Sequence, residues 1–454
     1  MSSAYRCKGV ELLRKGLFFA ALCLLTLSSC SPLSLAPEDL LEPPSLTERQ
    51  TRVEAALDTS LGLGTITWKY PQSGDYRSPF VFRDLDRDGL EEAIVFYVYN
   101  EDAAEDSGIV RAKVLKEGEE GDWTLAYDLT GAGDQVDFVA FAPVLDVDGE
   151  CLLVGWKDAG SASGGATLSV YSFLGGRLSP ELETEYSALD YGDYQGDGLT
   201  EIAVVSQDFS GEYLLSLMGR MAEGIIAPIG EARLATQAVG VHQVRRSLLW
   251  NNVWGVLVDE INDDNNTATE IFEVSKNGLS AVVSEAEGAL YSQTIRADDM
   301  LSTDLHSNGT FCVPTISSFP GDVPESDLAP PPLITWLRPS ANGEFVDVEY
   351  AVINEFAGYM FFLPLRWMDN VTILRDLESN EWRFYGIDQE TQAPPIELLR
   401  IWVYDVRDYR DSFTDYYEKI TERGLFQYYA WIPPLPQETL AVTGPEVARL
   451  FTLL

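Results

Sequence analysis

The fold class of this chain follows from residues 84–92, Asp84-Leu85-Asp86-Arg87-Asp88-Gly89-Leu90-Glu91-Glu92, which lead directly into Ala93-Ile-Val-Phe-Tyr-Val-Tyr99. Alternate carboxylates followed by a glycine suit a tight loop that wraps a hard cation in oxygen ligands. Position 12, where an EF-hand places a glutamate, is Val95, and the β-branched and aromatic residues around it predict a strand rather than a helix. The expected ligands are three side chains, a backbone carbonyl and a last carboxylate: Asp84, Asp86, Asp88, Leu90 and Glu92.

The same loop recurs along the chain. Residues 193–201, Asp193-Tyr-Gln-Gly-Asp197-Gly198-Leu199-Thr-Glu201, repeat the acid at position 1, Asp-Gly at positions 5 and 6, and Glu at position 9. Weaker copies start at Leu145-Asp146, Asn262 and Asp304. The fifth-position residues 88, 148, 197, 266 and 308 are 60, 49, 69 and 42 residues apart. This is the size of one four-stranded propeller blade, so the spacing predicts about five recognisable blades. A closed propeller of six or seven blades would include blades without the loop.

These loops resemble FG-GAP/VCBS-type repeats, in which a DxDxDGxxD/E loop joins two strands of each β-propeller blade. Residues 84–92 match that pattern best, and residues 193–201 match it second best. The chain as a whole is similar to a family of lipoproteins of Gram-positive anaerobes. The resemblance implies a mainly β fold with a propeller over residues 62–344 and an extracytoplasmic location, but it brings no activity.

Oxygen ligands favour calcium over zinc or copper, and magnesium demands a stricter octahedral geometry. We therefore expect calcium at 84–92. The second loop has Gln195 at position 3, so one charge is missing, and calcium there is the weaker expectation; its ligands would be Asp193, Asp197, Leu199 and Glu201. The copies at 146–149 and 304–312 have Leu152 and Cys312 at position 9, and we expect them to keep the turn without the ion. The alternative for every loop is an Asx turn, in which aspartates accept hydrogen bonds from their own backbone amides.

The N-terminus has the pattern of a lipoprotein signal. Four basic residues precede the apolar run 17–27, and Leu27-Ser28-Ser29-Cys30 resembles the bacterial lipobox. We expect residues 1–30 to be the signal peptide, Cys30 to be acylated, and residues 31–46 to form a proline-rich tether. The mature chain would then be anchored by lipid to the outer face of the cell membrane. An ordinary secretory signal with an incidental cysteine and an uncleaved anchor are the alternatives.

Composition predicts a globular protein with an acidic surface. The chain has 454 residues, 46% of them hydrophobic, which is enough for two or three domains with real cores. Its formal net charge of −41 excludes nucleic acid as a partner and suits cations, cationic polymers or neutral glycans. Solubility alone is an equally good explanation of the charge. Cys151 and Cys312 have no zinc spacing, and we expect buried thiols, with a disulfide between them as the alternative.

The two ends of the mature chain predict helices. Ser45 and Glu48 have capping-box spacing and start a helix over 47–61. From residue 345 to 454 the pattern predicts a smaller α+β domain with helices over 410–423 and from residue 444 to the end. Its aromatic strands are faintly similar to the Mog1/PsbP-like fold, whose members are mostly binding or assembly modules.

Motifs for catalysis are mostly missing. The chain has two histidines, His242 and His306, and no GxSxG, P-loop or Rossmann fingerprint. We predict a non-enzymatic, lipid-anchored binding or scaffold protein whose partner is a protein, a glycan or another envelope polymer. The alternative is an extracytoplasmic enzyme that acts on polysaccharide or another envelope polymer, with its site in the propeller channel. Carboxylates and aromatic side chains gathered at the channel mouth would favour the enzyme.

Overall fold

The computed structural model describes residues 46–61, 66–100, 108–118, 121–160, 165–174, 177–297, 300–320, 329–376, 379–387, 395–407, 416–435 and 439–454. Cys30, the expected signal peptide and nearly all of the expected tether lie outside these residues. The chain divides into two compact units, residues 1–59 and residues 60–454. Within the described part, no helix combines the length and the apolar character needed to span a bilayer.

The first unit contains most of helix α2 (Glu48–Leu61), which coincides with the helix expected over 47–61. Its N-terminal cap differs from the expected one, since Thr47 and Gln50 form it. The Gln50 N–H donates to Thr47 Oγ1 (3.3 Å), and the Thr47 N–H donates to Gln50 Oε1 (2.9 Å). Both bonds satisfy backbone donors that the helix start leaves open. Val53 and Leu57, four residues apart on one face, are buried.

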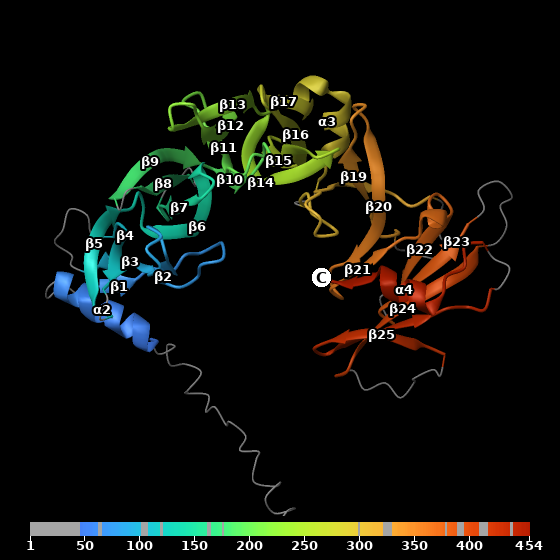
Figure 1. The fold of residues 1–454 in the computed structure, drawn as a ribbon. Coiled ribbons are helices and arrows are strands. Elements are labelled where there is room, and N and C mark those ends of the chain that lie inside the picture. Colours follow the sequence, from blue (N-terminus) through green and yellow to red (C-terminus); the bar gives the residue numbers. More distant parts are fainter. Residues whose placement is uncertain are drawn as a thin grey trace, which may run out of the picture. The chain divides into compact units, whose positions relative to one another are not determined.

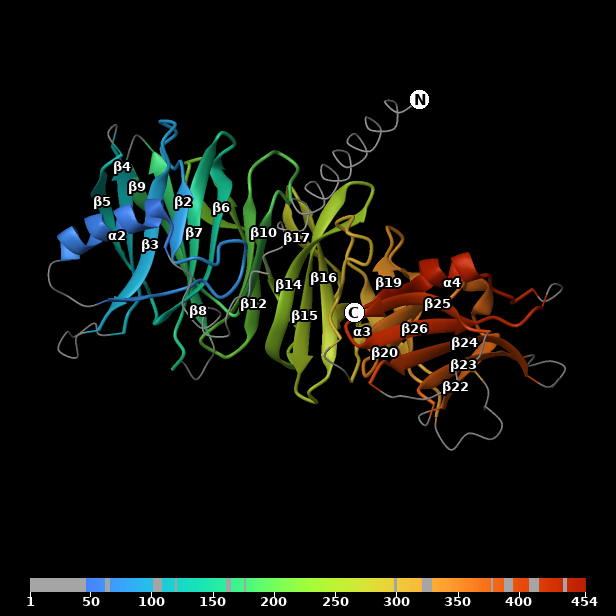
Figure 2. The ribbon, with the colours of Figure 1, turned by 90° about the horizontal axis from the view of Figure 1, so that it is seen from below.

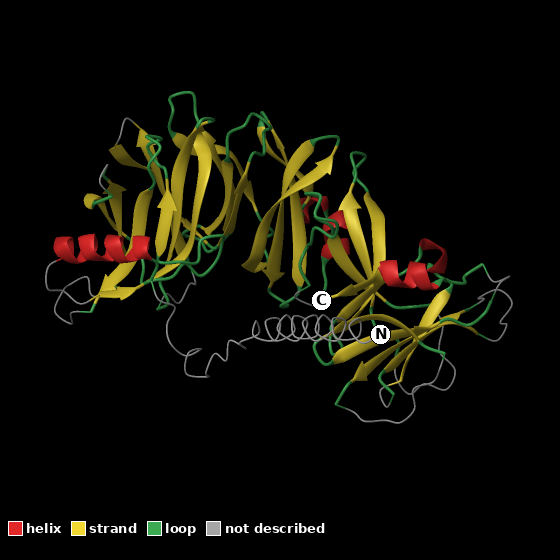
Figure 3. Ribbon diagram, turned by 60° about the horizontal axis from the view of Figure 1, so that its bottom comes forward, coloured by secondary structure: helices red, strands yellow, loops and turns green. Residues whose placement is uncertain are grey.

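The second unit is built mainly from antiparallel strands, as the sequence predicts (Figure 3). Its first four sheets follow one another along the chain, and each runs from one strand to the next in sequence order (Figure 1). In the first sheet, β1 and β2 pair with opposite ends of β3 and so share one strand position. The first sheet comprises β1 (Ile66–Trp68), β2 (Phe80–Arg83), β3 (Glu92–Tyr99), β4 (Arg111–Glu117) and β5 (Trp123–Thr130).

The next three sheets have four strands each, with the up-and-down order of a propeller blade. Figure 2 shows β14, β15 and β16 of the fourth sheet side by side. The second sheet contains β6 (Gln135–Asp146), β7 (Gly149–Lys157), β8 (Ala166–Leu174) and β9 (Arg177–Tyr186); the third β10 (Ala188–Gly192), β11 (Glu201–Gln207), β12 (Tyr213–Arg220) and β13 (Ile226–Arg233); the fourth β14 (Ala238–Trp250), β15 (Val253–Asn262), β16 (Thr267–Ser275) and β17 (Gly278–Val283).

The hydrophobic cores lie between consecutive sheets. Phe96 of the first sheet meets Trp156 of the second edge-on at 6.0 Å, and Leu153 of the second shares a buried cluster with Ile202 of the third. Strands such as β3 are buried on both faces, which explains their continuous apolar sequence. Cys151 and Cys312 are buried free thiols, so the alternative of a disulfide between them is wrong.

Two five-stranded sheets complete the described chain. The fifth has the order β18-β19-β20-β21-β27 and the sixth β22-β23-β24-β26-β25. Their strands are β18 (Val313–Ser317), β19 (Leu333–Pro339), β20 (Phe345–Asn354), β21 (Tyr359–Phe362), β27 (Phe451–Leu453), β22 (Val371–Asp376), β23 (Glu381–Gly386), β24 (Ile396–Asp405), β25 (Glu418–Arg423) and β26 (Phe426–Trp431). Short helices η1 (Glu285–Glu287) and α3 (Ala289–Thr294) precede β18, η2 (Leu365–Trp367) joins β21 to β22, and α4 (Gly444–Leu450) joins β26 to β27.

Three expectations for the C-terminal part need correction. The expected domain boundary at residue 345 falls between β19 and β20, which pair in one sheet. The helix predicted over 410–423 is wrong for residues 418–423, because they form β25 and pair with β26; residues 410–415 lie outside the described part. The last helix ends at Leu450, since residues 451–453 pair with β21.

Candidate metal loop and ligand cavity

The loop at 84–91 joins β2 to β3 and brings three of its acids together. One carboxylate oxygen each of Asp84, Asp86 and Asp88 lies within 4.8 Å of the others. The backbone reaches this arrangement through left-handed conformations at Arg87 (φ 62°) and Gly89 (φ 90°). Carboxylate oxygens are the hard donors that calcium takes, and a calcium ion at these three residues stays a prediction.

Backbone hydrogen bonds fix the same loop. The Gly89 N–H donates to Asp84 Oδ2 (3.2 Å), and the Leu90 N–H donates to Asp88 Oδ1 (2.8 Å). The Asx turns of the alternative interpretation are therefore present. They use one oxygen each of Asp84 and Asp88 and leave the other for a cation, so the two interpretations are compatible there. The second oxygen of Asp86 is paired with Lys116. Asp84 Oδ1 is buried and has no hydrogen-bond partner among the residues that the structure describes.

Glu92 supports this loop from the first position of β3. Its side chain is only 1% exposed, and its Oε2 accepts a hydrogen bond from the Leu85 N–H (2.7 Å). Burial raises the pKa of Glu92, and the bond from Leu85 opposes that shift. Glu92 is not part of the gathered group of three acids. Lys116 supplies a positive charge to this loop, because its ammonium is paired with Asp86 and lies 3.9 Å from Glu92 Oε1.

The loop at 193–200 joins β10 to β11 with the same three bonds. Asp193 Oδ2 accepts from the Gly198 N–H (3.0 Å), Asp197 Oδ1 from the Leu199 N–H (2.9 Å), and Glu201 Oε2 from the Tyr194 N–H (2.8 Å). Burial raises the pKa of Glu201 to about 7. Within the described ranges, however, these acids are not gathered as those of the first loop are.

The weaker copies divide into two kinds. At 304–309, Asp304 Oδ2 accepts from the Gly309 N–H (2.7 Å) and Asn308 Oδ1 from the Thr310 N–H (2.9 Å), so the turn is kept without the fifth-position acid. The copy at 262–266 joins the second and third strands of its sheet, whereas the loops at 84–91, 146–149 and 193–200 join the first and second. It is therefore not an equivalent loop of a repeated blade.

Glu270, the ninth position of that copy, belongs to a buried acidic pair. Glu260 on β15 and Glu270 on β16 are 0% and 1% exposed. Glu260 Oε1 accepts from the Tyr291 hydroxyl (2.5 Å), and Glu270 Oε2 accepts from the Ala235 N–H (3.0 Å). Burial raises the pKa of Glu260 to about 7 and that of Glu270 to about 8, and the negative charge of Glu260 adds to the second shift. Sequence analysis did not find Glu260, since no spacing distinguishes it among 72 acidic residues.

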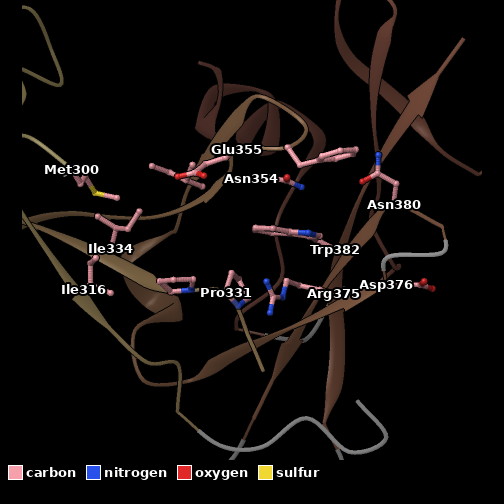
Figure 4. A pocket seen from close by; sticks show the side chains of 13 residues that line it. Met300, Ile316, Pro331, Ile334, Asn354, Glu355, Arg375, Asp376, Asn380 and Trp382 are labelled. Carbon is pink, nitrogen blue, oxygen red and sulfur yellow. The ribbon is translucent and has the colours of Figure 1, made fainter. Parts of the chain in front are cut away.

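A cavity of about 420 Å³ lies beside the fifth sheet and the β22–β23 hairpin (Figure 4). One wall is apolar and the other is mixed. Ile316 and Ile334 are directly opposed on β18 and β19, and they share a face of the fifth sheet. Arg375 and Trp382 are directly opposed on β22 and β23. The further lining residues are Met300, Pro331, Pro332, Ile353, Asn354, Glu355, Phe356, Asp376 and Asn380.

The polar groups of the cavity differ in how they are held. Arg375 donates from Nε (3.0 Å) and Nη2 (2.6 Å) to the Ala329 carbonyl, which fixes the plane of its guanidinium. Asp376 forms an ion pair with Arg383 (3.2 Å). Glu355 is exposed, and the described residues offer its carboxylate no partner. Phe356 is 85% exposed at the same place. A cavity with one apolar wall and a few polar groups has the composition of a small-ligand site.

No family model matches this chain, and no curated protein matches it. Among solved structures, a periplasmic gluconolactonase of Pseudomonas aeruginosa is similar over 72% of this chain and 86% of its own, with 10% identity and a TM-score of 0.25. A protein from Lactobacillus plantarum covers the same shares at 9% identity and a TM-score of 0.28. A putative 6-phosphogluconolactonase from Bacteroides fragilis covers 74% and 93%, at 12% identity and a TM-score of 0.25. Similarity at this level carries no argument about this chain's fold or activity.

Proposed function

We propose that this protein is a non-enzymatic binding protein, anchored by lipid at Cys30 on the outer face of the membrane, whose ligand occupies the cavity beside the fifth sheet. The proposed scaffold is a β-propeller of the FG-GAP/VCBS type. Its support is the series of antiparallel meanders with Asx loops between their first and second strands. The observation that carries the function is the cavity, with its apolar wall and three charged groups, Glu355, Arg375 and Asp376, of which Asp376 is paired with Arg383.

Calcium has a structural part in this proposal. Asp84, Asp86 and Asp88 would hold the ion, with the Leu90 carbonyl as a further ligand. The ion would neutralise acids of a loop in which Asp86 is paired with Lys116. The cavity is lined by other residues, so the ion would stabilise the fold and would not contact the ligand. The second loop, with Asp193, Asp197, Leu199 and Glu201, would hold calcium more weakly because one acid is missing.

The acidic pair does not support the alternative of an enzyme. Glu260 and Glu270 have the raised pKa values that acid–base catalysis uses. Both side chains are fully enclosed, however, so a polymer substrate has no access to them. We therefore interpret the pair as part of the fold.

A library of peptides, oligosaccharides and small metabolites tests the function by thermal shift. A ligand of the cavity raises the melting temperature of the wild-type protein but not that of Ile316→Trp, whose indole fills the cavity. Ile225→Trp is the matched control, since Ile225 is exposed on the β12–β13 turn, remote in sequence from every lining residue. If no compound distinguishes Ile316→Trp from this control, the proposed function is wrong.

A further inference from the structure

This inference rests on the proposed function and names the ligand class of the same cavity. We propose that the cavity binds a short peptide that has free amino and carboxyl termini and apolar side chains. The argument depends on the placement of one negative and one positive group at the edges of an apolar slot.

The apolar part of the slot is formed from both sides. Ile316 and Ile334 lie on one face of the fifth sheet, Met300 and Pro331 extend that surface, and Trp382 projects from β23 (Figure 4). At about 420 Å³ the volume is near the lower end of the range of ligand sites, which is roughly 300–1,000 Å³. The slot therefore suits a small ligand with apolar groups rather than a folded partner.

Two of the three charged groups that line the cavity, Glu355 and Arg375, lie on opposite sides of Trp382; the third, Asp376, is paired with Arg383. In Figure 4, Glu355 is above the indole and Arg375 is below it. The Glu355 carboxylate accepts no hydrogen bond from a described residue, and it is the group that an ammonium would approach. Arg375 is already oriented by its two bonds to the Ala329 carbonyl, and its Nη1 has no partner among the described residues. An oriented guanidinium of this kind matches a carboxylate.

Other ligand classes match this arrangement less well. A polyanion would meet Glu355 and the overall charge of −41. A polycation would meet Arg375. A neutral sugar would contact both charges without neutralising either, and it would lay hydroxyl groups on aliphatic side chains. A zwitterion with an apolar body pairs with both Glu355 and Arg375 and also packs against the apolar wall.

Calorimetric titration of the full-length protein with trileucine tests this inference. The probes are trileucine with free termini, its N-acetyl form, its C-amide form and a neutral cello-oligosaccharide. We expect the free peptide to bind and each single blocking group to weaken binding about tenfold, because each removes one charge-assisted contact. The doubly charged form should bind best.

Variants assign each terminus to its partner. Glu355→Gln should remove the preference for the free amino group, and Arg375→Gln the preference for the free carboxylate. Arg375→Lys keeps the charge and should retain part of the second preference, which a loss of folding would not. Glu344→Gln and Arg338→Gln are matched controls, because both residues are exposed in the fifth-sheet region and neither lines the cavity.

The outcomes separate this inference from the proposed function. If free and blocked peptides bind alike, or if only the oligosaccharide binds and Ile316→Trp abolishes that binding, the peptide inference is wrong while the proposed function stands. If no probe and no library compound responds to Ile316→Trp, both are wrong.

Discussion

The loops at 84–91 and 193–200 have the same backbone frame and different charges. In both, the position-1 aspartate accepts from the position-6 glycine, the position-5 aspartate from position 7, and the position-9 glutamate from position 2. Only the first loop has an acid at position 3, Asp86, where the second has Gln195. Lys116 is paired with that acid. The loop at 304–309 keeps two of these bonds with Asn308 in place of an aspartate. The frame is therefore a turn that needs no ion, and the extra acid of the first loop is what makes it a candidate calcium site.

Removing the position-1 acid from each loop is the strongest way to break this comparison. Asp193 accepts from three backbone N–H groups, those of Gly196 (2.6 Å), Asp197 (3.1 Å) and Gly198 (3.0 Å). Asp193→Ala leaves all three without their acceptor and should cost about 3 kcal/mol of unfolding free energy. Asp84→Ala removes one such bond and should cost about 1 kcal/mol in calcium-free buffer. Urea unfolding of both variants measures the difference, and equal losses would contradict the account of the frame.

The comparison extends to Glu260 and Glu270, two buried carboxyl groups outside these two loops. Burial raises the pKa of Glu260 to about 7 and that of Glu270 to about 8, above their ordinary value of 4.5. A raised folded-state pKa stabilises the fold fully below pH 4.5, and that stability is lost as the pH rises through 7 to 8. We expect the free energy of unfolding to fall by about 2 kcal/mol between pH 7 and pH 9.

The variant Glu270→Gln checks the origin of that pH dependence. It removes the titrating group that has the higher pKa of the pair, so the stability curve should become flatter over the same range. Glu344→Gln, an exposed position, should leave the slope as it is in the wild type. A wild-type slope in Glu270→Gln would show that other groups cause the pH dependence.

Substitution of Lys116 has the smallest expected effect, a change in the calcium affinity of the first loop. The Lys116 ammonium is paired with Asp86, so it competes with a cation for that carboxylate. Lys116→Met should strengthen calcium binding about three- to fivefold, the range of a partly exposed ion pair. The control is Lys113→Met, because Lys113 also lies on β4 and pairs with Asp128 (2.8 Å) instead. Calorimetry with calcium chloride measures both, and weaker binding by Lys116→Met would contradict the competition.

Strands and turns that are set by neighbouring residues could be predicted from the sequence. Strand pairing and the cavity, which combine residues distant in the sequence, could not. Runs such as 92–99 are strands because every residue in them suits a buried strand, and the loop frame follows from Asp and Gly at fixed spacing. Residues 418–423 form β25 despite the helical spacing of Tyr416, Tyr417 and Ile420, because β26 offers them an edge. The cavity combines residues from 300 to 382, and no local pattern brings Ile316 beside Trp382.

The most direct test of the central claim is a thermal melt of the full-length protein in calcium and in chelator, for the wild type, Asp88→Asn and Asp197→Asn. Calcium at a hundred times its dissociation constant should stabilise the wild type by about 2.7 kcal/mol. We predict that Asp88→Asn loses most of this increase and that Asp197→Asn keeps it, since only Asp88 belongs to the gathered acids. An increase that Asp88→Asn retains, or no increase in the wild type, would show that the loop at 84–91 is a turn like the others.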